Sequence, residues 1–223
     1  MFEKIFNMDN AEWRAMAKVA DLVIANLLFL VCSIPIVTIG ASMTALYTVT
    51  LKMVDKSGGY VSKDFWSAFK SNFKQSTIIW LIMLAVGVFI AGDYYLVSQM
   101  VATVGKAVKY IVLILAFLYF MIISYVFPLQ SKFENTIVRT ITNAAMMSIA
   151  HLVPWTILIT LVNVLPVFSL LGSVELFIDI ILPVMILLGF STIAWLNSFM
   201  FQKVFARYIP EEEEVIEEVV ETE

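Results

Sequence analysis

The sequence predicts an all-α, polytopic transmembrane helical bundle with six membrane segments. Of its 223 residues, 61% are hydrophobic and only 14% are charged, and the mean hydropathy is +0.92. A soluble domain holds about 45–50% apolar and about 25% charged residues. A folded chain of this length still exposes roughly a third of the surface of its unfolded form. The apolar excess therefore has to face lipid.

Four apolar runs are each long enough to cross a bilayer, which takes about 20 residues in a helix. They cover about residues 76–100, 110–129, 140–165 and 180–201, and charged residues flank each of them. Tyrosine and tryptophan side chains lie near several of their ends, as is typical of membrane interfaces. These runs predict four membrane-spanning helices.

The apolar region 22–51 has no charged residue and is interrupted by Pro35 and Gly40. Proline removes a helical hydrogen bond and glycine loosens the backbone, so a break is expected between them. Residues 20–34 and 36–51 then form a hairpin of two short segments, either fully crossing or re-entrant. The alternative is one long kinked crossing, which reduces the total to five segments.

The distribution of lysine and arginine favours the hairpin. Short cytoplasmic loops carry an excess of these residues, and the densest basic stretch is 52–74. With a hairpin, twelve of the fourteen basic residues lie on the cytoplasmic side and only Lys106 and Lys109 lie outside. With a single crossing the count is nine against five. We therefore expect six segments and two cytoplasmic termini.

Residues 62–74 predict a cytoplasmic interfacial amphipathic helix. Aromatic side chains recur there at helical spacing and lysines accompany them. Such a helix suits either the membrane surface or a cytoplasmic partner. The residues expected to make this contact are Lys63, Phe65, Trp66, Phe69, Lys70, Phe73 and Lys74.

The domain organisation that follows is simple. Residues 1–209 are expected to form a single membrane-embedded helical domain. Residues 210–223 hold eight of the eighteen acidic residues of the chain, and this composition is typical of a disordered, solvated tail.

Five polar residues within the predicted segments are candidates for a solute path: Asp21, Asn26, Asn143, His151 and Asn163. Polar and ionisable groups are costly in lipid, so each raises a functional question. His151 lies near the middle of its segment, and Asn143 is within about 80° of it on a helix. Each also has a structural interpretation. His151 can bond a carbonyl that Pro154 leaves free, and Asp21 can mark the interface.

No catalytic, cofactor or metal site is predicted. The sequence lacks G-x-S-x-G, H-E-x-x-H and a glycine-rich phosphate loop. One histidine and one cysteine, in different segments, do not make a zinc site. Nucleic-acid binding needs a dense basic face, which is absent from the sequence. The expected partner on these grounds is the lipid bilayer.

Several strings in the first eighty residues carry a family resemblance. They are 6–10 (FNMDN), 20–22 (ADL), 26–30 (NLLFL), 32–42 (CSIPIVTIGAS), 45–47 (ALY) and 64–75 (DFWSAFKSNFKQ). Through them the chain resembles the YesL-like family of bacterial membrane proteins, a family of unknown function. Its members look like multi-helix proteins that are often encoded beside genes for carbohydrate uptake and breakdown. No catalytic or binding residues are established for them.

The resemblance implies a multi-pass protein of the bacterial cytoplasmic membrane. We interpret it as a non-enzymatic accessory protein that assists carbohydrate uptake or sensing, with sugar transporter or sensor subunits as partners. The alternative is a small-solute transporter or channel that uses the broken first hairpin and His151 as its polar path. Broken helices with polar residues near the midplane are what transporters use.

Overall fold

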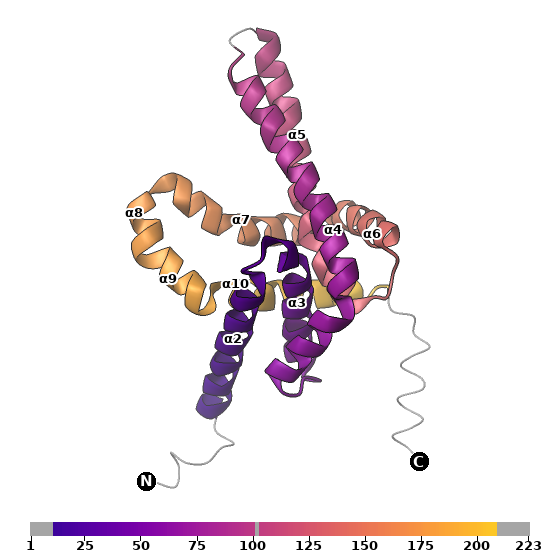
Figure 1. Cartoon of the computed structure of the whole chain (residues 1–223), viewed down its shortest axis with the longest axis vertical. Coiled ribbons are helices and arrows are strands. Elements are labelled where there is room, and N and C mark those ends of the chain that lie inside the picture. Colours follow the sequence, from indigo (N-terminus) through magenta and orange to yellow (C-terminus); the bar gives the residue numbers. More distant parts are fainter. Residues whose placement is uncertain (1–10, 101–102, 209–223) are drawn as a thin grey trace.

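The computed structural model describes residues 11–100 and 103–208, and every regular element in these ranges is helical (Figure 1). The all-α prediction is thereby confirmed. The predicted acidic tail 210–223 lies outside the described residues.

Helices α2 (Ala11–Ser33) and α3 (Ile39–Asp55) form a hairpin, with the 3₁₀ turn η1 (Ile36–Thr38) between them (Figure 1). Pro35 precedes the turn in an extended conformation, with ψ at 119°. Because proline has no amide hydrogen to donate, α2 ends before it. The region 22–51 therefore folds back on itself, as the charge distribution predicted.

At the tip, Thr38 satisfies backbone groups that the break leaves free. The hydroxyl of Thr38 donates to the carbonyl oxygens of Cys32 at 2.6 Å and Pro35 at 2.8 Å. Further along α3, the hydroxyls of Ser42, Thr44 and Thr48 donate to carbonyls one turn earlier in the chain. Most hydroxyl residues of this hairpin thus serve local backbone satisfaction and packing.

The hairpin packs on α4 (Val61–Ser98) through a close approach at Gly40. A Cβ atom at Gly40 would overlap the carbonyl oxygen of Ser76 and the Cβ of Trp80. One turn further along α3, Thr44 and Ser76 are joined by a buried hydroxyl–hydroxyl bond of 2.9 Å. At the other end of the pair, Lys52 and Asp64 form an ion pair of 2.9 Å. The two helices therefore run antiparallel.

Helix α4 is 38 residues long and unites two elements that the sequence analysis treated separately. The predicted interfacial helix 62–74 forms its first turns, and the predicted membrane segment 76–100 continues from it without a break. No proline or glycine occurs between Val61 and Gly87, so nothing in this stretch ends the helix. At about 1.5 Å per residue the helix is about 57 Å long.

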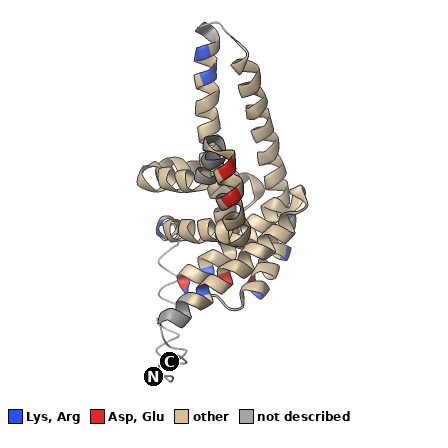
Figure 2. Ribbon diagram, turned by 90° about the vertical axis from the view of Figure 1, so that its left-hand side faces the viewer, with Lys and Arg blue, Asp and Glu red and all other residues tan. Residues whose placement is uncertain are grey.

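Helix α5 (Thr103–Lys132) returns beside α4 and completes a long second hairpin (Figure 1). The hydroxyl of Tyr119 donates to the carbonyl of Met83 at 2.9 Å, opposite the small residue Gly87. Near the tip, the ammonium group of Lys109 lies 5.4 Å from the centre of the Tyr94 ring. Figure 2 shows the basic residues of this tip separated from the other basic residues by a long, largely uncharged stretch of helix.

The predicted segment 140–165 is sharply bent in the structure. Helix α6 (Ile137–Ala150) is followed by the π-helical turn η2 (Leu152–Thr156) and by α7 (Ile157–Gly172), and the two halves meet at 107°. Val153, the residue before Pro154, has φ −119° and ψ 130°. A residue that precedes proline is disfavoured in the helical region, which explains the bend.

The predicted segment 180–201 lies within one longer helical run, Val174–Phe205. Its parts are α8 (Val174–Leu176), the π-helical turns η3 (Phe177–Ile181) and η4 (Met185–Gly189), α9 (Leu182–Val184) between them, and α10 (Phe190–Phe205). From α7 onward the chain extends sideways from the α4–α5 hairpin and then doubles back (Figure 1).

The described residues contain five helices or helical runs that are long and apolar enough to cross a membrane, and six if the bent pair counts as one span. The surfaces of α4 and α5 are correspondingly apolar. Val88, Phe89 and Ile114 are each at least 60% exposed. An exposed apolar surface of this kind marks a site of membrane or protein contact, which agrees with helices that are long and apolar enough to cross a membrane.

The close approach at Gly40 yields a stability prediction. Gly40→Ala should lower the free energy of unfolding in detergent by about 1–3 kcal/mol, because the added methyl group forces α3 and α4 apart. Gly92→Ala in α4 is the matched control, since a Cβ there meets no atom within 4 Å. It should be neutral or stabilising by up to about 1 kcal/mol. Equal unfolding curves for the two variants would contradict the proposed packing.

Candidate functional site

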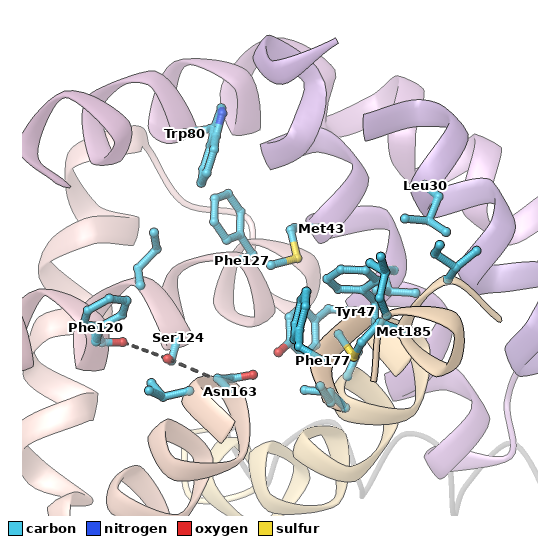
Figure 3. Close-up of a pocket in the computed structure, with 18 residues that line it drawn as sticks. Leu30, Met43, Tyr47, Trp80, Phe120, Ser124, Phe127, Asn163, Phe177 and Met185 are labelled. Atoms are coloured by element: carbon cyan, nitrogen blue, oxygen red, sulfur yellow. Dashed lines mark hydrogen bonds between the residues drawn. The ribbon is translucent and has the colours of Figure 1, made fainter. Parts of the chain in front are cut away.

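A cavity of about 610 Å³ lies where the two hairpins meet the last helical run. The α2–α3 hairpin, α4 and α5, α7, and the run from η3 to α10 all contribute to its walls. Figure 3 shows residues from these elements around the same space. Its lining residues are Leu30, Met43, Leu46, Tyr47, Trp80, Phe120, Ile123, Ser124, Phe127, Asn163, Val164, Phe177, Leu182, Met185, Ile186, Phe190, Ile193 and Ala194.

The walls are mainly aliphatic and aromatic, and none of the lining residues that the structure describes carries a charge. The indole N–H of Trp80 donates to the carbonyl of Ile36 at 2.8 Å, so its polar atom is already bonded. The remaining polar side chains of the wall are Tyr47, Ser124 and Asn163. Ion pairing cannot therefore hold a charged ligand here, whereas apolar contact can hold a hydrocarbon.

The polar side chains of the wall belong to one chain of hydrogen bonds. The amide nitrogen of Asn197 donates to the Tyr47 hydroxyl at 3.3 Å and to Oδ1 of Asn163 at 3.0 Å. Asn163 then donates to Ser124 at 3.4 Å, and Ser124 donates to the carbonyl of Phe120 at 2.7 Å. Figure 3 shows the last two links as dashed lines. This chain ties α3, α5, α7 and α10 together beside an apolar space.

Asn197 is the residue of this chain that the sequence analysis missed. It is fully buried, and its Oδ1 atom has no hydrogen-bond partner among the described residues. The signal was present, because an asparagine inside the apolar run 180–201 is costly in lipid and so marks a candidate functional residue. Its partner Tyr47 lies 150 positions away in the sequence, and no pattern in the sequence linked the two.

Asn26, predicted as part of a solute path, instead joins α2 to the last helical run. Its amide nitrogen donates to the carbonyls of Met185 at 3.1 Å and Ile186 at 2.7 Å. Its Oδ1 accepts the backbone N–H of Ser191 at 3.0 Å. Met185 and Ile186 open the π-helical turn η4, and Ser191 lies in the first turn of α10. Because Asn26 is fully buried, it satisfies these backbone groups where water cannot.

His151 lies at the bend between α6 and η2. Its Nε2 atom is 3.1 Å from the Tyr208 hydroxyl, and the imidazole ring packs edge to face with the Tyr208 ring. Its carbonyl oxygen accepts both the backbone N–H and the hydroxyl of Thr156, at 3.1 and 3.0 Å. The bend that Pro154 causes therefore has its own polar partners.

The five residues predicted for a solute path are not brought together. Asn26, His151 and Asn163 have the separate partners given above, and no hydrogen bond joins any two of the five among the described residues. Asp21 and Asn143 are half-buried on α2 and α6. The expected alignment of Asn143 with His151 on one helix is lost, because α6 ends at Ala150.

The predicted contact surface at the start of α4 is divided between two faces of the helix. Lys63, Trp66, Lys70, Phe73 and Lys74 are exposed, and we call these five residues the basic face. Phe65 is fully buried, so its prediction as a contact residue is wrong. Helical periodicity places it with Ala68 on the side packed against the hairpin, and Phe69 stacks on it there with ring centres 6.3 Å apart.

Acidic residues near this end of the molecule are bonded within the chain. Asp64 pairs with Lys52 and also accepts the backbone N–H of Gly59 at 3.1 Å. Asp55 lies 3.5 Å from Lys132 and accepts a hydrogen bond from Gln202. The basic face itself contains no acidic side chain, and it takes part in no ion pair in ranges 11–100 and 103–208.

The bonds of Asn26 give a second stability prediction. Asn26→Leu should lower the free energy of unfolding in detergent by about 2–5 kcal/mol, because it leaves buried backbone groups of the last run without partners. Asn143→Leu is the matched control, since this half-buried asparagine makes no hydrogen bond to the described residues. It should change the free energy by less than about 1 kcal/mol. A similar loss in both variants would refute the assigned role of Asn26.

One comparison with known proteins gives a match. Residues 22–94 match the model of a family described as a protein of unknown function, DUF624. The matched range extends from α2 through the tip of the first hairpin and along most of α4. No curated protein and no solved structure matches the chain. The family is uncharacterised, so the match assigns the chain no activity.

Proposed function

We propose that this protein is a non-enzymatic accessory protein of the bacterial cytoplasmic membrane that assists a carbohydrate uptake or sensing system. In this proposal the basic face of α4 contacts a cytoplasmic subunit of that system. The link to carbohydrate comes from the resemblance to the YesL-like family. The contact surface comes from the arrangement of charge at the start of α4.

The separation of charge on α4 is the observation that supports the contact most directly. Lys63, Lys70 and Lys74 point outward with Trp66 and Phe73 between them, whereas Asp64 is turned toward Lys52. Lysines around aromatic side chains suit a partner with an acidic rim and an apolar centre. An excess of lysine is also expected on the cytoplasmic side of a membrane protein.

The transporter alternative has less support. Its proposed path needs neighbouring polar side chains, and these residues have separate partners in different parts of the bundle. The cavity described above has mainly apolar walls, and its described lining residues are uncharged. Hydroxyl groups of a sugar would lose their hydrogen bonds to water there with little compensation.

Replacement of the three lysines tests the proposal. In cells that lack the native gene, Lys63→Gln, Lys70→Gln and Lys74→Gln should be combined in one complementing chain. We expect roughly tenfold lower recovery of the cross-linked partner, because each surface charge contributes about 0.2–1 kcal/mol. Uptake of the labelled sugars that depend on the native gene should fall in parallel.

The control is Lys106→Gln with Lys109→Gln at the far end of α4–α5, which should leave recovery and uptake unchanged. Expression and membrane insertion of both variants should be checked by immunoblotting. Equal uptake and equal partner recovery for both variants and the native chain would refute the accessory role assigned to the basic face.

A further inference from the structure

The size and the chemistry of the cavity restrict what it can hold. Its volume of about 610 Å³ falls within the range of about 300–1,000 Å³ that is typical of small-molecule sites. Leucine, isoleucine, methionine and phenylalanine make up most of the walls. A hydrocarbon chain gains from burial against such walls, at about 0.8 kcal/mol for each methylene group.

One polar atom in this wall has an unused hydrogen. The Tyr47 hydroxyl accepts a hydrogen bond from Asn197, because an amide nitrogen can only donate. Its own hydrogen has no acceptor among the described residues. Tyr47 is only 5% exposed and lines the cavity, so water outside the bundle does not reach it freely. A buried donor of this kind calls for an acceptor on the bound molecule.

The amide of Asn163 adds a second donor to the same part of the wall. One N–H bonds Ser124 at 3.4 Å, and the amide has a second N–H that no described residue accepts. Figure 3 shows Asn163 beside Ser124, and Tyr47 close to Phe177 and Met185. The wall therefore offers hydrogen-bond donors without a cation. An uncharged acceptor, such as a carbonyl oxygen, fits this arrangement.

We propose that the cavity binds one acyl chain of a bilayer glycerolipid, and that the ester carbonyl at the head of this chain accepts a hydrogen bond from Tyr47. A glycerolipid combines a long apolar chain with an uncharged acceptor at its end. The bilayer that surrounds the helices supplies it at high local concentration. The phosphate group stays outside the cavity, since no lining residue is basic.

The absence of charge in the walls also separates this ligand from a free fatty acid. A carboxylate beside Tyr47 would be buried without a counter-ion, and burial of an unpaired charge is strongly unfavourable. The ester of a glycerolipid has the same chain and the same carbonyl without the charge. The uncharged wall thus disfavours an ionised fatty acid, whereas the ester is neutral without taking up a proton.

The ester bond can be tested with the unmodified full-length chain. The protein is placed in nanodiscs that contain a photoactivatable diester phosphatidylglycerol, and two competitors are compared. One is a diester phosphatidylglycerol, and the other is the diether analogue with the same chains and headgroup but no carbonyls. The diester should compete about two- to tenfold better, the effect of one hydrogen bond. Cross-links should map to cavity residues such as Phe120, Phe177 and Met185.

A pair of tyrosine variants assigns the effect to one hydroxyl. Tyr47→Phe should reduce the preference for the diester to near unity while cross-linking in the cavity persists. Tyr119→Phe is the control, because this hydroxyl bonds Met83 and does not line the cavity. It should keep the full preference.

Three results would overturn the proposal. They are equal competition by diester and diether on the native chain, cross-links that map outside the cavity, and stronger competition by a free fatty acid than by the diester. The first comparison needs no variant, so a failure of Tyr47→Phe to fold would not prevent the test.

Discussion

The amide of Asn26 holds α2 against the helical run Val174–Phe205, and the path of the second half of the chain depends on this contact. It bonds backbone groups of Met185, Ile186 and Ser191, which lie about 160 positions later in the chain. In lipid, backbone groups need partners within the protein. The same requirement explains why Thr38 bonds carbonyls at the hairpin tip and why Thr156 bonds the carbonyl at the bend. The breaks in these helices persist because nearby polar side chains replace the lost bonds.

The cavity follows from these breaks. The hairpin turns back at Pro35, the second half of the chain turns sideways after His151, and Asn26 brings the run from Val174 to Phe205 back toward the hairpin. The apolar cavity lies between these elements, which all contribute to its walls. Asn197 links three of its walls through Tyr47 and Asn163. A lipid chain in this space would complete the packing of the bundle.

Local chemistry in the sequence predicted much of the fold. Apolar runs located the membrane helices, and the proline and glycine at positions 35 and 40, with the lysine distribution, predicted the hairpin. The bend at His151 was not predicted, although Pro154 marked its place, because a proline in a membrane helix need not cause a sharp turn. The partners of Asn26 and Asn197 were not predictable from spacing, since each contact joins residues at least 34 positions apart. The same limit applies to the cavity, which exists only in the assembled bundle.

The hairpin that turns back at Pro35 sets the side of the membrane for every later segment, and labelling of single cysteines in intact cells tests it directly. In a Cys32→Ala chain, a cysteine is placed in turn at Lys18, Ser57 and Lys106 and exposed to a reagent that does not cross membranes. If α2 and α3 both cross the membrane, the cysteines placed at Lys18 and Ser57 lie on the cytoplasmic side and are protected from the reagent. The cysteine placed at Lys106 is labelled. Labelling at both Lys18 and Lys106, with protection only at Ser57, would show a single crossing and contradict the account.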